Sequence, residues 1–396
     1  MMKGHRLFIF ILAVGVFGIL NTEMGVIGLL PYVSAYFGVS ISEAGALVSL
    51  FALIVAVSGP VMPLLMSRFE RKKAMLFVLA VFIAGNIVSA VTDSFAVLLA
   101  ARVIPAFFHP VYCALAFSAA AEAVPREYAP DAVGKVMVGV AAGMVLGVPV
   151  SNFLADVVSL QAAFAFFTAV TAAAFLATLC CIPSMPAGPK RTYGEQIGIL
   201  RRPAVWMSIF AIVFMNGALF GVFTYLAEYL GVVTALSGGA VSLFLFAYGL
   251  SNSAGSFLSG RLIRWNEGLI VQAFPWILLA LYALVWLGGT TAAVMAVLVV
   301  AWGFIGGVNA STQQYILTQT APEAKEFASG IFLTSANAGT MAASALCGWC
   351  IAQWGTAAVL LGGASFAAVS AVFLWLRLLA FRSARSDGRS AASFYS

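Results

Sequence analysis

Residues 7–36 read LFIFILAVGVFGILNTEMGVIGLLPYVSAY, and this stretch decides the class of fold. Glu23 is its single charged residue. The run exceeds the roughly 20 largely apolar residues that a helix needs to cross a bilayer. A membrane barrel would instead show segments of roughly ten residues that alternate between apolar and polar side chains. The stretch therefore predicts a membrane-spanning helix.

The same pattern fills the rest of the chain. Of its 396 residues, 63% are hydrophobic and only 9% are charged, whereas about a quarter of the residues of a soluble protein are charged. The apolar runs predict an all-α membrane protein with twelve transmembrane helices, at 7–36, 44–66, 74–92, 95–124, 134–156, 160–182, 205–230, 238–262, 268–288, 292–320, 328–352 and 356–380. These spans leave no room for a separate soluble catalytic domain.

The basic residues predict the topology. Every Lys and Arg except Arg102 lies before the first span, in or beside an even-numbered connection, or near the end of the chain. Basic residues mark the cytoplasmic connections of membrane proteins, so we expect both termini in the cytoplasm. The net charge of +6 is then a consequence of topology, and nucleic acid is not expected as a partner.

The chain also carries an internal duplication. Residues 45–71 and 238–264 align at a constant offset, with identities that include Ser49 with Ser242, Arg68 with Arg261 and Arg71 with Arg264. Repeated bundles of six helices occur in secondary transporters. The expected domains are an N-terminal six-helix bundle at 1–182, a cytoplasmic linker at 183–204, a C-terminal six-helix bundle at 205–380 and a cytoplasmic tail at 381–396.

Several short segments resemble those of a known family. They are LNTEMGVIGLLP at 20–31, FERKK at 69–73, GVAAGMVLGVP at 139–149, RRPAV at 201–205 and QQYILTQTAP at 313–322. On these segments the chain resembles the major facilitator superfamily, and within it the bacterial drug/proton antiporter-type exporters that include arabinose-type sugar efflux and purine efflux proteins. The resemblance implies the major facilitator fold and a monomer in the bacterial cytoplasmic (inner) membrane, surrounded by lipid. It also implies a proton gradient as energy source, with no cofactor.

Glu23, Arg102 and His109 are ionisable residues well inside predicted spans, where a charge costs about 2.5–3.5 kcal/mol on insertion scales. Glu23 can bind and release a proton, whereas the Arg102 side chain cannot give up its charge. His109 follows Arg102 by seven residues, or two helical turns, so the two share roughly one face. With the resemblance, these three residues are the expected proton-coupling group. Each also has a purely structural interpretation, as a tie between helices or as a core histidine bonded to a carbonyl.

Polar side chains inside the spans are candidates for substrate binding. Pro105 and Pro110 predict a kink in the fourth span that exposes backbone carbonyls. In the family that the chain resembles, the first, fourth, seventh and tenth spans line the cavity. The candidate substrate-binding residues are Asn21, Glu23, His109, Asn216, Tyr225, Asn309, Gln313, Gln314 and Asn337. Each amide or phenol can equally tie two helices together.

Two further groups are candidates for gating and packing. They are Arg68, Arg71 and Lys72 after the second span, and Gly139, Gly143, Gly147 and Pro149 in the fifth. Small residues at every fourth position let two helices approach closely. The basic residues can hold the cytoplasmic face closed or act only as orientation signals. Pro63 and Ser67 stand where the family pattern has Gly and Asp, which weakens the case for a gating ion pair built on that Asp.

The leading hypothesis is proton-coupled efflux, by antiport and alternating access, of small organic molecules such as sugars, purines, nucleosides or drugs. A facilitator or a proton symporter of the same fold is the alternative. A membrane-integral enzyme or receptor is a remote alternative, because the chain lacks the motifs of nucleophilic or phosphate chemistry. No metal site is expected, since the chain has 2 His and Cys347 and Cys350 lie within one predicted span as buried thiols.

Overall fold

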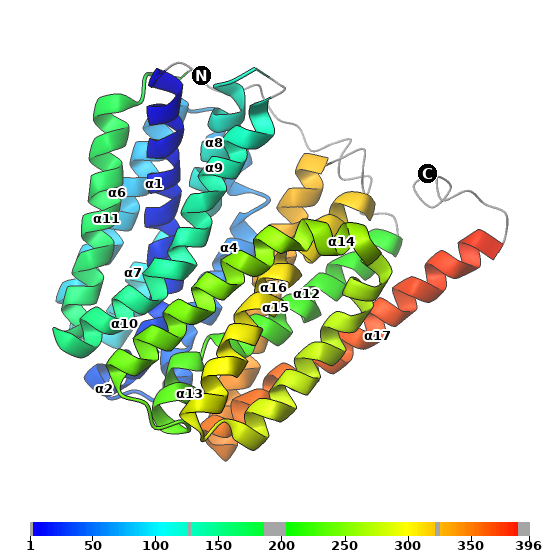
Figure 1. The fold of residues 1–396 in the computed structure, drawn as a ribbon. Coiled ribbons are helices and arrows are strands. Elements are labelled where there is room, and N and C mark those ends of the chain that lie inside the picture. The colour runs from blue at the N-terminus through cyan, green and yellow to red at the C-terminus, as the bar shows by residue number, and fades with distance from the viewer. Residues whose placement is uncertain (1–2, 126–127, 186–202, 321–324, 387–396) are drawn as a thin grey trace. The chain divides into compact units, whose positions relative to one another are not determined.

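A computed structural model of the chain describes residues 3–125, 128–185, 203–320 and 325–386 (Figure 1). Within these ranges every regular element is a helix. Eleven stretches of the described residues are long and apolar enough to cross a membrane, so the predicted all-α membrane fold is confirmed. The predicted linker at 183–204 and tail at 381–396 lie largely outside the described residues, and the predicted domain boundaries stay predictions.

The remaining predicted span, at 328–352, is also helical. It is α16 (Lys325–Trp354), a helix of 30 residues that includes Ser, Thr, Asn and Gly. This length is enough to cross a bilayer. Each of the predicted spans therefore corresponds to a helical stretch in the described ranges. The side of the membrane on which the termini lie stays a prediction.

Spans one to six are built from short and long helices. They are α1 (Lys3–Gly25) with η1 (Val26–Leu29) and α2 (Leu30–Phe37); α3 (Ile41–Ala44), α4 (Ala46–Ser58) and α5 (Met62–Met66); α6 (Arg71–Val91); α7 (Phe95–Ala106) and α8 (His109–Glu122); α9 (Ala129–Ala142), η3 (Gly143–Gly147) and α10 (Val148–Val157); and α11 (Leu160–Cys181). Because η1 is a 3-10 helix and η3 is a π-helix, the first and fifth spans each change winding partway along.

The later spans form longer helices. They are α12 (Pro203–Phe223) and α13 (Leu226–Val232); α14 (Gly238–Gly288); α15 (Ala292–Thr320); α16; and η6 (Thr356–Ala358) with α17 (Val359–Ser386). α14 contains the two predicted spans 238–262 and 268–288, with a break at Asn266, whose backbone is not helical. The interruption falls between the two predicted spans.

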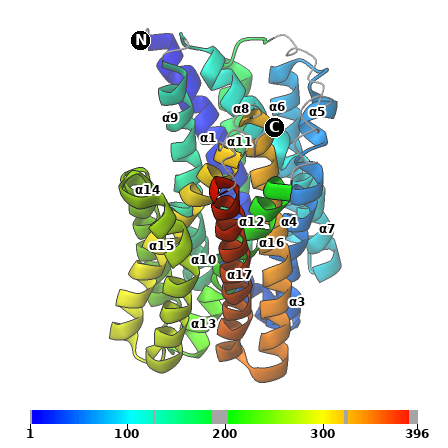
Figure 2. The same ribbon diagram turned by 90° about the vertical axis from the view of Figure 1, so that its right-hand side faces the viewer.

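The described residues form two compact units. The first contains α1 to α11 together with Leu226–Gly231 and Leu236–Gly249, and the second contains most of the C-terminal half. In the first unit α1 packs against α8, α9 and α11 (Figure 2). Its core includes the buried side chains of Leu12, Phe82 and Tyr112. The helix that carries Glu23 is thus surrounded by three others.

Two glycines of α1 accommodate side chains of its neighbours. Gly15 lies against the hydroxyl of Tyr112 in α8, and a Cβ atom at Gly15 would overlap it. Gly25 lies against the ring of Phe167 in α11, where a Cβ atom would come within 2.5 Å of a ring carbon. These close approaches hold the segment between them, including Glu23, in a defined orientation.

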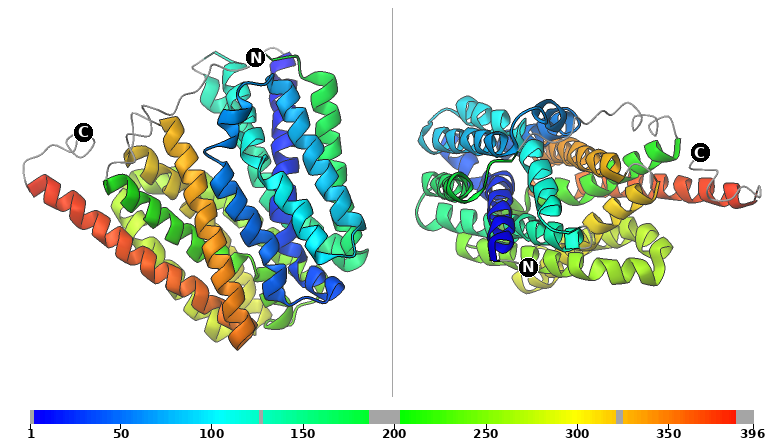
Figure 3. Two further views of the ribbon diagram at one scale, coloured as in Figure 1. Left: turned by 180° about the vertical axis from the view of Figure 1, so that it is seen from behind. Right: turned by 90° about the horizontal axis from the view of Figure 1, so that it is seen from above.

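In the second unit α12 packs against α16 and α17 (Figure 3). A Cβ atom at Gly339 of α16 would overlap the backbone carbonyl of Val213 in α12. A Cβ atom at Gly139 of α9 would likewise overlap the backbone carbonyl of Ala13 in α1. The first and fifth spans therefore approach each other as the seventh and eleventh do, which agrees with the duplication seen in the sequence.

Candidate functional site

The candidate proton-coupling residues come from three helices of the first unit. Glu23 lies near the end of α1, and Arg102 and His109 lie on α7 and α8. α7 ends directly after Pro105, the Phe108 amide donates to the Pro105 carbonyl at 2.9 Å, and α8 starts with His109 followed by a proline. The predicted kink is therefore present, and it separates the helices that carry Arg102 and His109.

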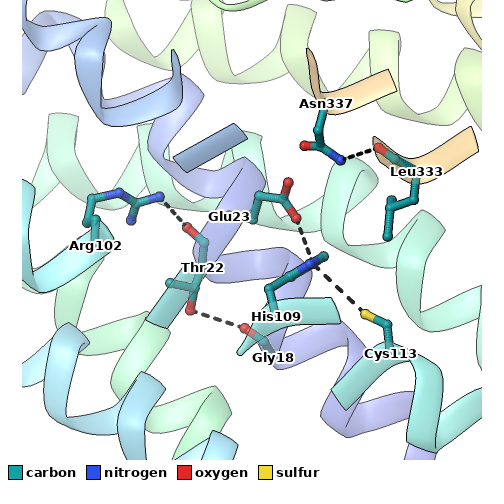
Figure 4. A network of polar contacts seen from close by, with 8 residues as sticks. All are labelled: Gly18, Thr22, Glu23, Arg102, His109, Cys113, Leu333 and Asn337. Atoms are coloured by element: carbon teal, nitrogen blue, oxygen red, sulfur yellow. Dashed lines mark hydrogen bonds and ion pairs between the residues drawn. The ribbon is translucent and has the colours of Figure 1, made fainter. Parts of the chain in front are cut away.

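The Glu23 carboxylate and the His109 imidazole form a close, buried contact (Figure 4). The His109 Nε2 atom lies 2.9 Å from the Glu23 Oε2 atom, and only 4% and 10% of the two side chains are exposed. The Cys113 thiol, one turn further along α8, lies 3.9 Å from the same nitrogen. His109 is thus a partner of a carboxylate and not of a backbone carbonyl, and the pair can share a proton.

Arg102 is buried beside this pair but bonds to the backbone. Its Nη2 atom donates to the Thr22 carbonyl at 3.0 Å, and the guanidinium lies 5.5 Å from the centre of the Phe51 ring. Arg102 also interacts electrostatically with Glu23. Its Nε and Nη1 atoms are buried without a hydrogen-bond partner among the described residues. The guanidinium therefore retains donors for a carboxylate, a water molecule or a solute.

Thr22 connects the three spans around Arg102. Its hydroxyl donates to the Gly18 carbonyl at 3.1 Å and accepts a hydrogen bond of 3.0 Å from the Asn86 amide in α6. The ring of Phe51 also contacts His109 edge-on, with the ring centres 6.0 Å apart. Thr22, Asn86 and Phe51 were not predicted as site residues. For Thr22 and Asn86 a signal existed, because both are polar residues inside apolar runs.

Asn21 and the glycines of the fifth span form the other side of α1. The side chain of Asn21 is fully buried, and neither of its polar atoms has a hydrogen-bond partner among the described residues. A Cβ atom at Gly147 would lie 2.7 Å from its Oδ1 atom, and one at Gly143 would lie 2.8 Å from the Cβ atom of Leu20. Together with Gly139, these glycines form a packing surface for α1, and Pro149 lies in the first turn of α10.

Three of the candidates in the second unit are engaged in helix contacts. Asn216 donates to the Ala336 carbonyl at 2.7 Å and to the Thr340 hydroxyl at 2.9 Å, and Tyr225 donates to the Ser344 carbonyl at 3.1 Å. Asn337 donates to the Leu333 carbonyl of its own helix at 3.0 Å. The bonds of Asn216 and Tyr225 join α12 and the residues just after it to α16. These bonds match the alternative role of Asn216 and Tyr225, in which each side chain ties two helices together.

Two amides of α15 are better placed to bind a solute. Asn309 and Gln313 lie one helical turn apart and are almost completely buried. The Oδ1 atom of Asn309 and both polar atoms of Gln313 have no hydrogen-bond partner among the described residues. Unpaired buried amide groups are costly, so these atoms are available to water or a solute. Gln314 lies on the same helix, and its side chain lies outside the part of the structure that is described.

The basic residues after the second span make specific contacts. Arg71 forms a two-pronged ion pair with Glu122 at the end of α8, at 2.6 and 3.2 Å. Lys72 donates to the Leu179 carbonyl of α11 at 2.9 Å. Arg68 lies exposed in the turn before them. Arg71 and Lys72 therefore tie the start of α6 to the ends of two other helices.

No group of three or more His, Cys, Asp or Glu side chains in the described ranges could hold a metal ion. The thiols of Cys347 and Cys350 are free and buried in α16. A fold of membrane-spanning helices with ionisable and amide groups held inside it is typical of membrane transporters, in which such groups line solute and proton pathways.

Comparison with known families identifies which kind of transporter this is. The profile of the Major Facilitator Superfamily matches residues 12–326. The chain therefore belongs to the Major Facilitator Superfamily.

The relatives agree with this assignment. The chain is 31% identical over 348 residues to the uncharacterized MFS-type transporter YtbD of Bacillus subtilis, with 85% of this chain and 86% of that protein covered. It is 27% identical over 342 residues to a probable sugar efflux transporter of Helicobacter pylori, with 84% and 85% covered. The crystal structure of the nucleoside transporter NupG superposes with a TM-score of 0.75 at 12% identity and covers 95% of this chain and 99% of that one, which shows the same fold.

These findings confirm the predicted family and the major facilitator fold. The chain is a transporter and not an enzyme. With bacterial relatives and many membrane-spanning helices, it is a multi-pass protein of the bacterial cytoplasmic membrane.

Proposed function

We propose that the protein exports small polar organic molecules in exchange for protons, by alternating access. The observation that carries this proposal is the buried contact between the Glu23 carboxylate and the His109 imidazole, at 2.9 Å. A carboxylate and an imidazole at this distance can hold one exchangeable proton, and His is the side chain whose charge changes most readily near neutral pH. The proton gradient is then the energy source.

The charges around the pair supply a reason for coupling. Arg102 keeps its positive charge, so an ionised Glu23 and a neutral His109 leave the group with no net charge. Uptake of one proton leaves a net charge of +1. Burying an uncompensated charge costs several kcal/mol, so protonation favours a conformation in which water or a solute reaches the group. Release of the proton restores the neutral, dry arrangement.

The buried amides support a neutral polar substrate. Asn21, Asn309 and Gln313 offer donors and acceptors without a formal charge. Such groups suit sugars, nucleosides and purines, and they also accept polar parts of drug molecules. The sugar efflux relative and the nucleoside transporter with the same fold support the same range of solutes. One proton moved across 100 mV supplies about 2.3 kcal/mol, which corresponds to about fortyfold accumulation of a neutral solute.

Transport into proteoliposomes tests the proposal. Radiolabelled pentoses, purines, nucleosides and antibiotics are offered to vesicles with and without an imposed pH gradient. We expect at least one solute to move against its gradient in the wild type, and Glu23→Gln to abolish the response to pH. Glu43→Gln is the matched control, because Glu43 caps the short helix α3 through Ser40. If Glu23→Gln responds to pH as the wild type does, the pair is not the proton site. Movement without any pH response would indicate a facilitator.

A further inference from the structure

One side chain of the fifth span joins the first span to the start of α14. The Ser242 hydroxyl of α14 donates to the Asn152 Oδ1 atom at 2.7 Å, and the Asn152 Nδ2 atom donates to the Gly28 carbonyl in η1 at 2.8 Å. Asn152 and Ser242 are 2% and 7% exposed. All three residues belong to the first compact unit. Asn152 thus has both ends of its amide occupied, each by a different span.

The contact between the fifth span and α14 extends to both sides of this bond. The Asp156 carboxylate occupies the place that a Cβ atom at Gly238 would take, and it accepts a hydrogen bond from the Tyr32 hydroxyl at 3.2 Å. At the other end, a Cβ atom at Gly249 would lie 2.7 Å from the Cα atom of Val145. As the contacting residues of α14 rise in number from Gly238 to Gly249, their partners in the fifth span fall in number from Asp156 to Val145. The two segments therefore run antiparallel in one register, with the Asn152–Ser242 hydrogen bond in the middle.

Asn152 also lies at the break in the first span. η1 begins at Val26, three residues after Glu23. The Ser151 hydroxyl lies 2.7 Å from both the Gly25 carbonyl and the Gly147 carbonyl of its own span, either of which can accept its hydrogen, and Asn152 donates to the Gly28 carbonyl. A 3-10 segment within a longer helix often marks a hinge. Ser151 and Asn152, which are adjacent in α10, therefore lie at hydrogen-bond distance from carbonyls of η1 and of the residue before it, directly after the proposed proton site.

We propose that Asn152 is a positioning residue that links the geometry of η1 to the packing of α14 on α10. This inference rests on the proposed function in one respect, namely that Glu23 changes its protonation during transport. When Glu23 changes partners, the winding of η1 changes and the Gly28 carbonyl moves. Asn152 follows that carbonyl, and its bond to Ser242 breaks. The start of α14 is then free to separate from α10.

Distance measurements between spin labels test the first half of this link. The labels are placed on Val158→Cys and Gly239→Cys, which are exposed and lie beside Asp156 and Gly238 at one end of the contact. Cys180 and Cys181, which are exposed, are replaced by serine in this background. We expect Ser242→Ala and Asn152→Ala to raise the population with a long distance about fivefold, the effect of losing one neutral hydrogen bond. Ser242→Thr, which keeps the hydroxyl, should give the same distance distribution as the wild type.

Ser251→Ala is the matched control, because Ser251 lies on the same helix and its hydroxyl donates to the Val300 carbonyl of α15. It should leave the distance distribution unchanged. An equal shift in Ser251→Ala, or no shift in Ser242→Ala, would overturn the proposal.

The second half of the link is tested by adding Glu23→Gln to the labelled proteins. With Asn152 present, Glu23→Gln should shift the distance distribution. With Asn152→Ala the shift should disappear, whereas with Ser251→Ala it should persist. Equal shifts in the presence and absence of the Asn152 amide, or no shift in either, would show that Asn152 transmits nothing. These measurements need no substrate, so a failure of proton-coupled transport and a failure of the link are seen in different experiments.

Discussion

The imidazole of His109 and the carboxylate of Glu23 face each other between α8 and α1, with Nε2 and Oε2 2.9 Å apart. Arg102 contacts the carbonyl of Thr22, the residue before Glu23, at 3.0 Å. The acid therefore has a titratable partner at hydrogen-bond distance and a permanent cation close by. A proton that enters the pair changes the charge of the whole group.

Glu23 and His109 should act as one unit in transport. We expect Glu23→Gln and His109→Gln each to reduce pH-driven transport about tenfold or more, since either change leaves the pair unable to exchange a proton. The double variant should lose little more than either single variant, because residues in direct contact have non-additive effects. Transport rates of the four proteins at several pH values give the comparison. Additive losses would mean that the two residues act independently; Cys113→Ser serves as a control next to His109.

A substitution of Arg102 should restore the stability that is lost in Glu23→Gln without restoring transport. Glu23→Gln removes the carboxylate that compensates the buried guanidinium, and we expect it to lower the free energy of unfolding by about 3 kcal/mol. Adding Arg102→Met removes the uncompensated charge and should restore the melting temperature without restoring transport. Thermal unfolding in detergent measures the first effect and solute flux the second. A double variant as unstable as Glu23→Gln would contradict this account of the charges.

The glycines of α9 should differ sharply in their tolerance of a methyl group. A Cβ atom at Gly139 overlaps the Ala13 carbonyl, whereas a Cβ atom at Gly134 of the same helix meets nothing within 4 Å. We expect Gly139→Ala to lower the free energy of unfolding by about 1–3 kcal/mol through overpacking. Gly134→Ala should raise it by about 0.5–1 kcal/mol, since Ala loses less entropy than Gly in a helix. Equal melting temperatures for the two variants would rule out the close contact between α1 and α9.

Glu70, before α6, should make stability depend on pH. The Ser184 hydroxyl and then the Lys73 ammonium group lower the pKa of this carboxyl below its ordinary value of 4.5. Because the pKa is lower in the folded protein, the stabilisation is present above pH 4.5 and is lost as the pH falls through the folded value. The melting temperature of Glu70→Gln should therefore lie below that of the wild type at pH 7, and the difference should shrink at acid pH. A difference that is independent of pH would show that packing, and not charge, is responsible.

The spans could be predicted from the sequence because they depend on composition alone. Even α16, with its polar residues, contains a predicted span. The change of winding at η1 could not be predicted, since it accompanies bonds from Ser151 and Asn152 to carbonyls of another span. The partner of Glu23 could not be predicted either. Arg102 and His109 were expected on one face, and the break after Pro105 decides which of them reaches the carboxylate.

The polar residues of the second half show the same limit. Asn216 and Gln313 are both amides in apolar runs, and nothing in their immediate sequence distinguishes them. Asn216 meets a carbonyl and a hydroxyl of α16, whereas Gln313 meets neither a donor nor an acceptor among the described residues. An amide with unused donors and acceptors differs from a structural one only in its neighbours. Those neighbours come from helices that are distant in sequence.

The side chains seated on the glycines of α1 restrict how this helix can move. The side chain of Tyr112 packs against Gly15, and the side chain of Phe167 packs against Gly25. The two aromatic side chains reach α1 from different helices and restrict its rotation. Turning α1 about its own axis would require both aromatic rings to withdraw at once. The helix must therefore travel with α8 and α11 as one rigid body. Any movement of the Glu23 carboxylate within that body is left to its own side-chain torsions and to the backbone beyond Gly25.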